Sequence, residues 1–292
     1  MQPRHLLPLG IVTLIWGTTW YVIKTQIGVV PVEWSVVYRF TVAAVIMFGA
    51  AVITRRRLRY PLQAHVFFLA LGLFQFAGNF NFVYQASRWV TSGLISVAFA
   101  LLIIPNAILA GLVFGHRESW RFWAGAGLGI VGVTMLFRQE LLALQGSPDL
   151  LFGIGATVLA VLCASVANVM QAAPAARSYS MIGMLSWAML YGALIDAAIA
   201  LGVRGAPVVE MTPLYAGGVF YLAFAASVVA FILYFRVIRE VGPAKAAYSG
   251  VLVPFVAMAL STLLEGYRWT PIAATGAVLT VSGLFVALSA RT

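Results

Sequence analysis

Long apolar runs separated by short polar gaps occupy almost the whole of this 292-residue chain. Ten of the runs are long enough to cross a bilayer as helices, because about 20 residues rising about 1.5 Å each span its ~30 Å hydrocarbon core. They lie at 7–26, 34–54, 65–85, 91–114, 120–138, 150–172, 181–203, 214–235, 244–264 and 271–290. The pattern predicts an all-α polytopic membrane protein with ten transmembrane helices.

The fourth run, residues 91–114, is uncharged but contains Pro105. Proline leaves the carbonyl four residues earlier unpaired, and in lipid such a group is tolerated only where other protein groups enclose it. A bent helix surrounded by protein is therefore predicted, and Pro105 is a candidate hinge.

The chain also resembles itself at an offset of 149 residues. Under this offset Gly93 falls on Gly242, Pro105 on Pro254, Trp120 on Trp269 and Gly127 on Gly276. Such coincidences predict two copies of one unit, at residues 1–140 and 148–292. Pro254 then becomes the second candidate hinge.

The distribution of Lys and Arg predicts the orientation in the membrane. If the N-terminus is cytoplasmic, twelve of the 18 basic residues lie in inside segments and five in outside segments. We therefore expect an even number of spans with both termini cytoplasmic. Because five helices per copy is an odd number, the second copy must enter the membrane from the opposite side. Inverted repeats of this kind are typical of secondary transporters, whose binding site lies at the repeat interface.

Composition narrows the function classes. The chain is 62% hydrophobic and only 9% charged, which excludes an ordinary soluble domain. The net charge of +10 would suggest nucleic-acid binding only if it were concentrated on one face, and here it is spread over many short gaps, so lipid is the expected surroundings. A membrane enzyme would need clustered histidines, carboxylates or a nucleophile motif, but the three histidines lie at span ends. No enzyme activity, metal or cofactor is expected.

Aromatic and amide side chains within the spans are the candidates for substrate binding. Trp16 and Trp20 share one helical face, where their rings could hold an apolar group while donating N–H bonds; anchoring at the membrane interface is the alternative. Asn79 belongs to an amide-rich third span, and amides in hydrocarbon either line a cavity or tie helices together. The full set of candidates is Trp16, Trp20, Tyr38, Asn79, Tyr84, Asn168, Trp187, Tyr191 and Tyr248.

Two charged residues fall well within predicted spans. Arg39 requires a partner in the membrane, and we favour a helix–helix contact over a cavity role. Asp196 is the candidate for proton coupling, although its expected place near the outer end allows it simply to be hydrated. Exchange or facilitated transport stays open beside proton antiport. Glycines in the fifth and tenth spans predict close helix packing or a dimer face, in a monomer or weak homodimer.

Several local motifs together resemble the drug/metabolite transporter superfamily, specifically its ten-helix EamA-type members. They are LIWGTTW from Leu14, Tyr38-Arg39-Phe40, Tyr84-Gln85-Ala86, GHRESWRFWAGAGLGIVGV from Gly115, and Glu265-Gly266. Gly115-His116 departs from the family's usual Gly-Glu, so no role for a carboxylate is expected there.

The resemblance implies a central cavity, alternating access, and export from the cytoplasm across the bacterial inner membrane. The tryptophan-rich first span and the third span resemble those of aromatic amino-acid exporters of the YddG type, which implies aromatic and other neutral amino acids as substrates. Other amphipathic metabolites or drugs are the alternative, and a passive channel is a further one.

Overall fold

A computed structural model describes residues 3–115, 117–143, 147–241 and 248–289, and every regular element within these ranges is helical. In chain order the elements are α1 (Pro3–Thr25), α2 (Val32–Ile53), α3 (Leu62–Leu71), η1 (Gly72–Gly78), α4 (Asn79–Ala86), α5 (Ser92–Ala100), α6 (Ile103–Phe114), α7 (Trp120–Ala143), α8 (Pro148–Ala172), α9 (Pro174–Arg177), α10 (Met181–Arg204), α11 (Pro213–Tyr221), η2 (Leu222–Val229), α12 (Ala230–Val241), α14 (Tyr248–Leu264) and α15 (Pro271–Ser289). The predicted all-α class is confirmed.

Helices long and apolar enough to cross a membrane correspond to the first eight predicted runs. Within the described ranges they are Leu7–Thr25, Val32–Ile53, Leu62–Ala86, Ser92–Phe114, Trp120–Arg138, Pro148–Ala172, Met181–Arg204 and Pro213–Val237. The last two predicted runs form shorter apolar helices, Leu252–Leu264 and Pro271–Ala287. The chain is therefore a polytopic membrane protein, and the count of ten crossings stays a prediction.

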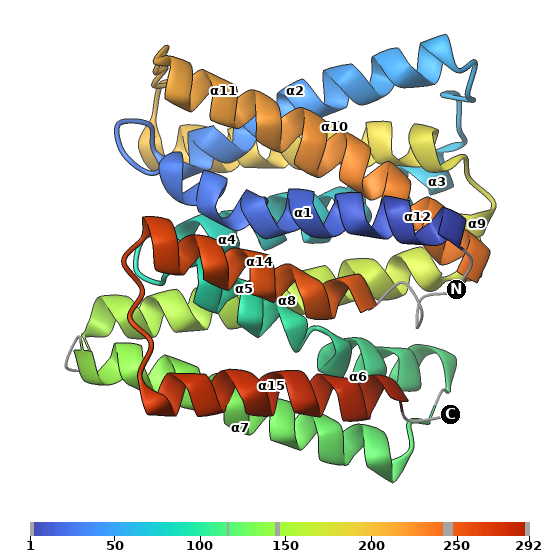
Figure 1. The fold of residues 1–292 in the computed structure, drawn as a ribbon. Coiled ribbons are helices and arrows are strands. Elements are labelled where there is room, and N and C mark those ends of the chain that lie inside the picture. The colour runs from blue at the N-terminus through green and yellow to red at the C-terminus, as the bar shows by residue number, and fades with distance from the viewer. Residues whose placement is uncertain (1–2, 116, 144–146, 242–247, 290–292) are drawn as a thin grey trace.

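The helices lie roughly side by side in one bundle (Figure 1). α2, α10 and α11 form one edge, α7 and α15 form the opposite edge, and α1, α5, α8 and α14 lie between them. α1 begins and α15 ends at the same end of the bundle, whereas α8 runs in the opposite direction to α1 (Figure 1).

The main helix contacts fall into corresponding pairs. α7 packs along α15, and α2 packs along α10. α1 contacts α12 and α14, while α8 contacts α4, α5 and α6. Likewise η1 contacts α10 and η2 contacts α2. Each of these contacts between the halves therefore has a counterpart in which the two halves exchange places. The contacts within the first half, α1 with α5 and α2 with α4, have no such counterpart among the main contacts of the described residues.

Both of the longer composite spans contain a π-helical segment in their middle, η1 at Gly72–Gly78 and η2 at Leu222–Val229. π-helical turns are rare and are often found at functional sites. The hydrophobic pattern gave no indication of either segment.

The fourth span is interrupted four residues before Pro105, at Leu101 and Leu102, which separate α5 from α6. Pro105 has no N–H for the Leu101 carbonyl, and this oxygen accepts from the Ile104 N–H instead, at 2.9 Å. In contrast, α14 passes through Pro254 without a break. The two prolines therefore differ in local structure, and their role as a matched pair of hinges stays a prediction.

Glycines bring α7 and α15 into close contact. A Cβ atom on Gly132 would lie 2.5 Å from the carbonyl oxygen of Gly276, and one on Gly125 would lie 2.6 Å from that of Gly283. Both distances are impossible without backbone movement, because the atoms opposite belong to the main chain. The predicted close packing occurs within the chain, between these two helices.

We expect Gly132→Val to destabilise the protein by about 1–3 kcal/mol, because the added atoms would force α7 and α15 apart. Gly127 is the matched control, since a Cβ there would meet nothing within 4 Å. Thermal unfolding in detergent should show a lower midpoint for Gly132→Val and an unchanged one for Gly127→Val. Equal midpoints for the two variants would contradict the close packing described here.

Candidate functional site

A cavity of about 180 Å³ lies among α1, α2, η1, α4, α5, α8, α12 and α14. Its wall therefore comes from both halves of the chain. It combines aromatic rings with a small number of polar groups, which is the usual composition of a small-molecule site.

The aromatic part of the wall centres on two tryptophans of α1. Trp16 donates its indole N–H to the Ala226 carbonyl at 3.2 Å, and its ring meets Phe231 and Tyr234 edge-on at centroid distances of 5.6 and 4.9 Å. The Trp20 ring lies 4.8 Å from that of Phe99. Trp16 is thus fixed against η2 and α12, while the indole nitrogen of Trp20 has no hydrogen-bond partner among the described residues.

Arg39 of α2 is the one charged residue among the described side chains that line the cavity. It is 1% exposed, and its guanidinium carbon lies 4.2 Å from the ring centroid of Phe80 and 5.2 Å from that of Phe40. Its Nε donates to the Ser227 hydroxyl at 3.2 Å, and this hydroxyl donates in turn to the Leu222 carbonyl at 2.9 Å. Arg39 therefore makes a helix–helix contact, between α2 and η2, which was the role that we favoured. It also lines the cavity, which was the alternative role.

The amide side chains of the third span both line the cavity and tie helices together. Asn79 is 4% exposed and donates its amide N–H to the Gln75 carbonyl at 3.4 Å. Gln75 accepts from Gln171 of α8 at 3.5 Å, which ties η1 to α8. Asn79, Gln75 and Asn168 all line the cavity.

Four of the nine predicted binding residues therefore lie at one cavity: Trp16, Trp20, Asn79 and Asn168. Four others do not line it: Tyr38, Tyr84, Trp187 and Tyr191. Tyr248 begins α14, and its side chain lies outside the part of the structure that is described. The side chains of Thr19, Gln75, Phe80, Ser96, Phe99, Phe231 and Tyr234 line the cavity and were not among the predicted residues.

The four predicted residues that do not line the cavity make other contacts. Tyr38 directly precedes Arg39 in α2 but does not line the cavity, and its hydroxyl donates to the Val208 carbonyl at 2.9 Å. Tyr84 is fully buried beside the Arg39 guanidinium. Trp187 donates to the Leu58 carbonyl at 2.9 Å, and the Tyr191 hydroxyl lies 2.8 Å from His65 Nδ1. These two rings pack α10 against α3 and the segment before it, so they lie away from the cavity to which Trp16 and Asn79 belong.

Asp196 is fully buried and accepts from the Asn81 amide at 2.5 Å. It lies between α10 and α4 and is absent from the cavity wall, so the alternative that it is simply hydrated at the membrane surface is wrong. Its part in proton coupling stays a prediction. Within the described residues, no group of three or more histidines, cysteines and carboxylates could hold a metal ion.

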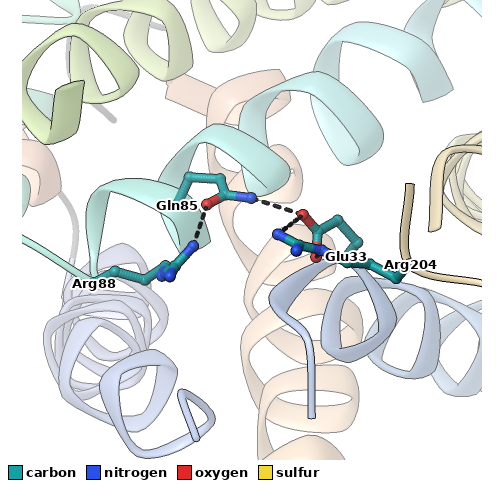
Figure 2. Close-up of polar contacts among 4 residues, drawn as sticks. All are labelled: Glu33, Gln85, Arg88 and Arg204. Carbon is teal, nitrogen blue, oxygen red and sulfur yellow. Dashed lines mark hydrogen bonds and ion pairs between the residues drawn. The ribbon is translucent and has the colours of Figure 1, made fainter. Parts of the chain in front are cut away.

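A polar network joins α2, α4 and α10 (Figure 2). It lies at the end of the bundle where α1, α4, α10 and α14 finish, here termed the distal end (Figure 1). Glu33 is 5% exposed and accepts from Arg204 at 3.0 and 3.1 Å and from Gln85 at 2.8 Å. Arg88 donates to the other end of the Gln85 amide at 3.3 Å. This network links α2 and α4 of the first half to α10 of the second.

Two further contacts reinforce the distal end. Lys24 donates to the Ser87 carbonyl at 2.6 Å, which fixes the end of α1 to the segment after α4. Glu265 accepts from the backbone N–H and from the hydroxyl of Ser92, which joins the end of α14 to the start of α5. Polar contacts thus hold helices of both halves together at this end.

A second concavity, of about 450 Å³, lies between α5, α14 and α15. Its wall is almost entirely apolar and includes Pro254 and Phe255. Such a groove offers little to orient a polar solute, and it suits the hydrocarbon chains of the surrounding lipid.

Comparisons with known proteins agree with this arrangement. The EamA-like transporter family matches the chain twice, at residues 6–138 and 151–289. A "Probable amino-acid metabolite efflux pump" of Salmonella typhimurium is 26% identical over 289 residues, covering 94% of this chain and 92% of its own. The "Uncharacterized transporter YoaV" of Bacillus subtilis is 24% identical and covers 95% of each chain, and the "Uncharacterized inner membrane transporter YedA" of Escherichia coli K12 is 27% identical and covers 91% and 86%. One crystal structure superposes with a TM-score of 0.72 at 19% identity, covering 100% of this chain and 99% of its own, which shows the fold alone.

We expect Arg204→Gln to lower stability by about 1 kcal/mol or more, because it leaves the buried Glu33 carboxylate without its cation; Arg204 itself is 39% exposed, which keeps the loss moderate. The double variant Glu33→Gln/Arg204→Gln should regain part of this loss, since it removes both charges. Arg88→Gln is the control and should change stability little. Strictly additive effects on the unfolding midpoint would contradict coupling between Glu33 and Arg204.

Proposed function

Because the chain belongs to the EamA-like transporter family, we propose that it exports small amphipathic solutes, namely aromatic and other neutral amino acids, across the inner membrane of a bacterium. The observation that carries the proposal is the cavity, in which the indoles of Trp16 and Trp20 share one wall with Arg39 and Asn79. An amino acid presents the same combination, an apolar side chain beside a charged polar head. Multi-pass insertion in the inner membrane is supported by the apolar helices and by the named inner-membrane relative.

The size and charge of the cavity favour an amino acid over a drug. Sites for drug-sized ligands usually enclose about 300–1,000 Å³, and this cavity encloses about 180 Å³. No carboxylate is present among its lining residues in the described structure, so cationic drugs would find no counter-charge there. Two relatives, from Salmonella typhimurium and Escherichia coli, are named as probable amino-acid metabolite efflux pumps. The narrower resemblance to exporters of the YddG type stays a prediction.

The same proposal includes two inverted repeats, at residues 1–140 and 148–292. Three observations support it: the family matches the chain twice, α1 and α8 run in opposite directions (Figure 1), and the helix contacts between the two halves correspond. The central π segments η1 and η2 occupy corresponding places. A cavity at the junction of such halves is typical of secondary transporters.

Transport would proceed by alternating access, with the two halves rocking about the cavity. Opening at the distal end would require separation of Glu33 from Arg204, because this ion pair joins α2 to α10 (Figure 2). The interruption at Leu101 and Leu102 provides a place where the fourth span could bend as the halves move.

The transport test uses purified protein in liposomes with radiolabelled phenylalanine, tryptophan, leucine and lysine, with and without a pH gradient. We expect saturable uptake of the neutral amino acids, and a roughly tenfold or greater loss of aromatic uptake in Trp16→Ala, because its ring contacts with Phe231 and Tyr234 shape the wall. Trp120→Ala is the matched control, since Trp120 is 74% exposed and outside the cavity.

Saturation and countertransport would separate a carrier from a passive channel, which shows neither. Stimulation by the pH gradient would favour proton antiport, and its absence would favour facilitated or exchange transport. Failure of every amino acid to be transported would overturn the proposed substrate class.

We expect Pro105→Ala to slow turnover several-fold while leaving substrate affinity nearly unchanged. Alanine restores an N–H that can bond the Leu101 carbonyl, so α5 and α6 would tend to fuse into one straight helix. Pro148→Ala is the control, because a proline in the first turn of α8 causes no bend. Maximal rates and half-saturation constants from the same liposome assay measure both effects, and an unchanged maximal rate would remove Pro105 as a hinge.

A further inference from the structure

Several buried polar atoms on the cavity wall have no hydrogen-bond partner in the described part of the chain. They are Arg39 Nη1, Trp20 Nε1, Asn79 Oδ1 and Ser96 Oγ. Buried polar atoms are almost always bonded to protein, to water or to a ligand, because an unbonded one costs free energy. Other buried atoms of the described residues also lack a partner, but these four belong to the wall of one cavity, where a polar solute would supply the missing bonds.

Arg39 is the most demanding of these groups. A guanidinium has five N–H donors in a fixed planar array, and Ser227 accepts from only one nitrogen. The rings of Phe40 and Phe80 contact the cation but supply no acceptor oxygen. Tyr84, which lies beside it, is a neutral phenol. A cation buried at membrane depth requires compensation, and no carboxylate of the described residues provides it.

The two buried carboxylates of the neighbouring helices bind elsewhere. Glu33 pairs with Arg204, and Asp196 accepts from Asn81. Arg39 is therefore a buried cation on the wall of a solute cavity, and the groups that interact with its N–H donors, the hydroxyls of Ser227 and Tyr84, are both neutral. A carboxylate matches such a guanidinium better than any neutral group, because it can accept two parallel N–H bonds.

Asn79 offers a hydrogen-bond acceptor on the wall of the same cavity. The Gln75 carbonyl can only accept, so the Asn79 amide nitrogen faces it and the Asn79 oxygen is left as a free acceptor. Asn79 precedes Phe80, whose ring contacts the Arg39 guanidinium. A cationic donor, Arg39, and a neutral acceptor, Asn79, thus line one cavity, as a carboxylate and an ammonium group of the same solute would require.

We propose that Arg39 binds the free carboxylate of the transported solute, with Asn79 accepting from its amino group. This inference rests on the proposed export function and narrows its substrate class to solutes with a free carboxylate. Amines, esters and amides with the same side chain are excluded, because they would leave the buried guanidinium without its counter-charge.

The test measures binding to the purified full-length protein by quenching of tryptophan fluorescence, with two matched pairs of probes. The first pair is phenylalanine and phenylalaninamide, and the second is 3-phenylpropionate and 3-phenylpropionamide. The wild-type protein should bind each acid at least tenfold more tightly than its amide. Arg39→Gln should weaken binding of the acids roughly 10- to 100-fold and bring each ratio close to one, while Arg39→Lys should keep part of the preference.

Arg204→Gln is the control variant, since it removes an arginine outside the cavity and should keep the acid preference. Asn79→Leu should weaken phenylalanine more than 3-phenylpropionate, because only the former has an amino group. Equal binding of acid and amide by the wild-type protein would overturn the proposal even if Arg39→Gln failed to fold. An unchanged acid preference in folded Arg39→Gln would overturn it as well.

The two proposals can fail separately. If 3-phenylpropionate binds in an Arg39-dependent manner but phenylalanine neither binds nor is transported, amino-acid export is wrong and the carboxylate site is upheld. If phenylalanine is transported and Arg39→Gln keeps the preference for the acid, the export function is upheld and the carboxylate site is wrong.

Discussion

The structure depends on one property of its surroundings, namely that hydrocarbon offers no hydrogen bonds to a polar group. This property explains why the spans are helical and why backbone groups freed by departures from regular helix find partners close by. At the interruption before α6, the Leu101 carbonyl receives the Ile104 N–H. Within η2, the Ser227 hydroxyl donates to the Leu222 carbonyl. Each irregular backbone segment thus has its own local compensation, and both lie next to residues that line the cavity.

The same constraint distinguishes the charged groups from one another. Glu33 and Arg204 neutralise each other at the distal end, where water is close, and Asp196 has an amide donor within the helix packing. Arg39 has aromatic rings and a hydroxyl, which compensate a full charge less completely. Asp196 also has one oxygen without a partner among the described residues, but of these charged groups only Arg39 lines the cavity and can therefore offer a free donor to a solute there.

Much of the fold could be predicted from the sequence because it depends on local pattern. Apolar run length predicted the spans, and Pro105 predicted a bend in the fourth span. The prediction that protein surrounds this span was wrong, since α6 has no buried residue. The glycines predicted close packing or a dimer face without naming the partner, and the structure shows that α7 packs against α15. Trp16, Trp20, Asn79 and Asn168 line one cavity, and their binding of a substrate stays a prediction.

The remainder could not be predicted, because depth along a helix does not determine which neighbour a side chain faces. Trp187 and Tyr191 have the composition of a binding site, but the direction in which α10 packs turns them toward His65 and Leu58. The Glu33 network requires the ends of three helices to meet, which no single span reveals. Arg39 was identified as an intramembrane charge, but its place on the cavity wall depends on how α2 is rotated against η2.

The two halves contribute different chemistry to the cavity despite their similar architecture. Its charged and most of its polar groups come from the first half, including Arg39, Asn79 and Ser96, whereas α12 and α14 add Phe231, Tyr234, Phe235 and Val253. In a rocking transporter, separation of the halves would therefore withdraw the rings of Phe231, Tyr234 and Phe235, while the polar head and the indoles of Trp16 and Trp20 would stay together in the first half. Loss of that apolar contact weakens binding at the moment of opening, because the free energy gained by burying apolar surface is proportional to the area that is covered. Two halves of similar architecture but different cavity lining would thus allow the solute to be released before its polar head loses its contacts with the first half.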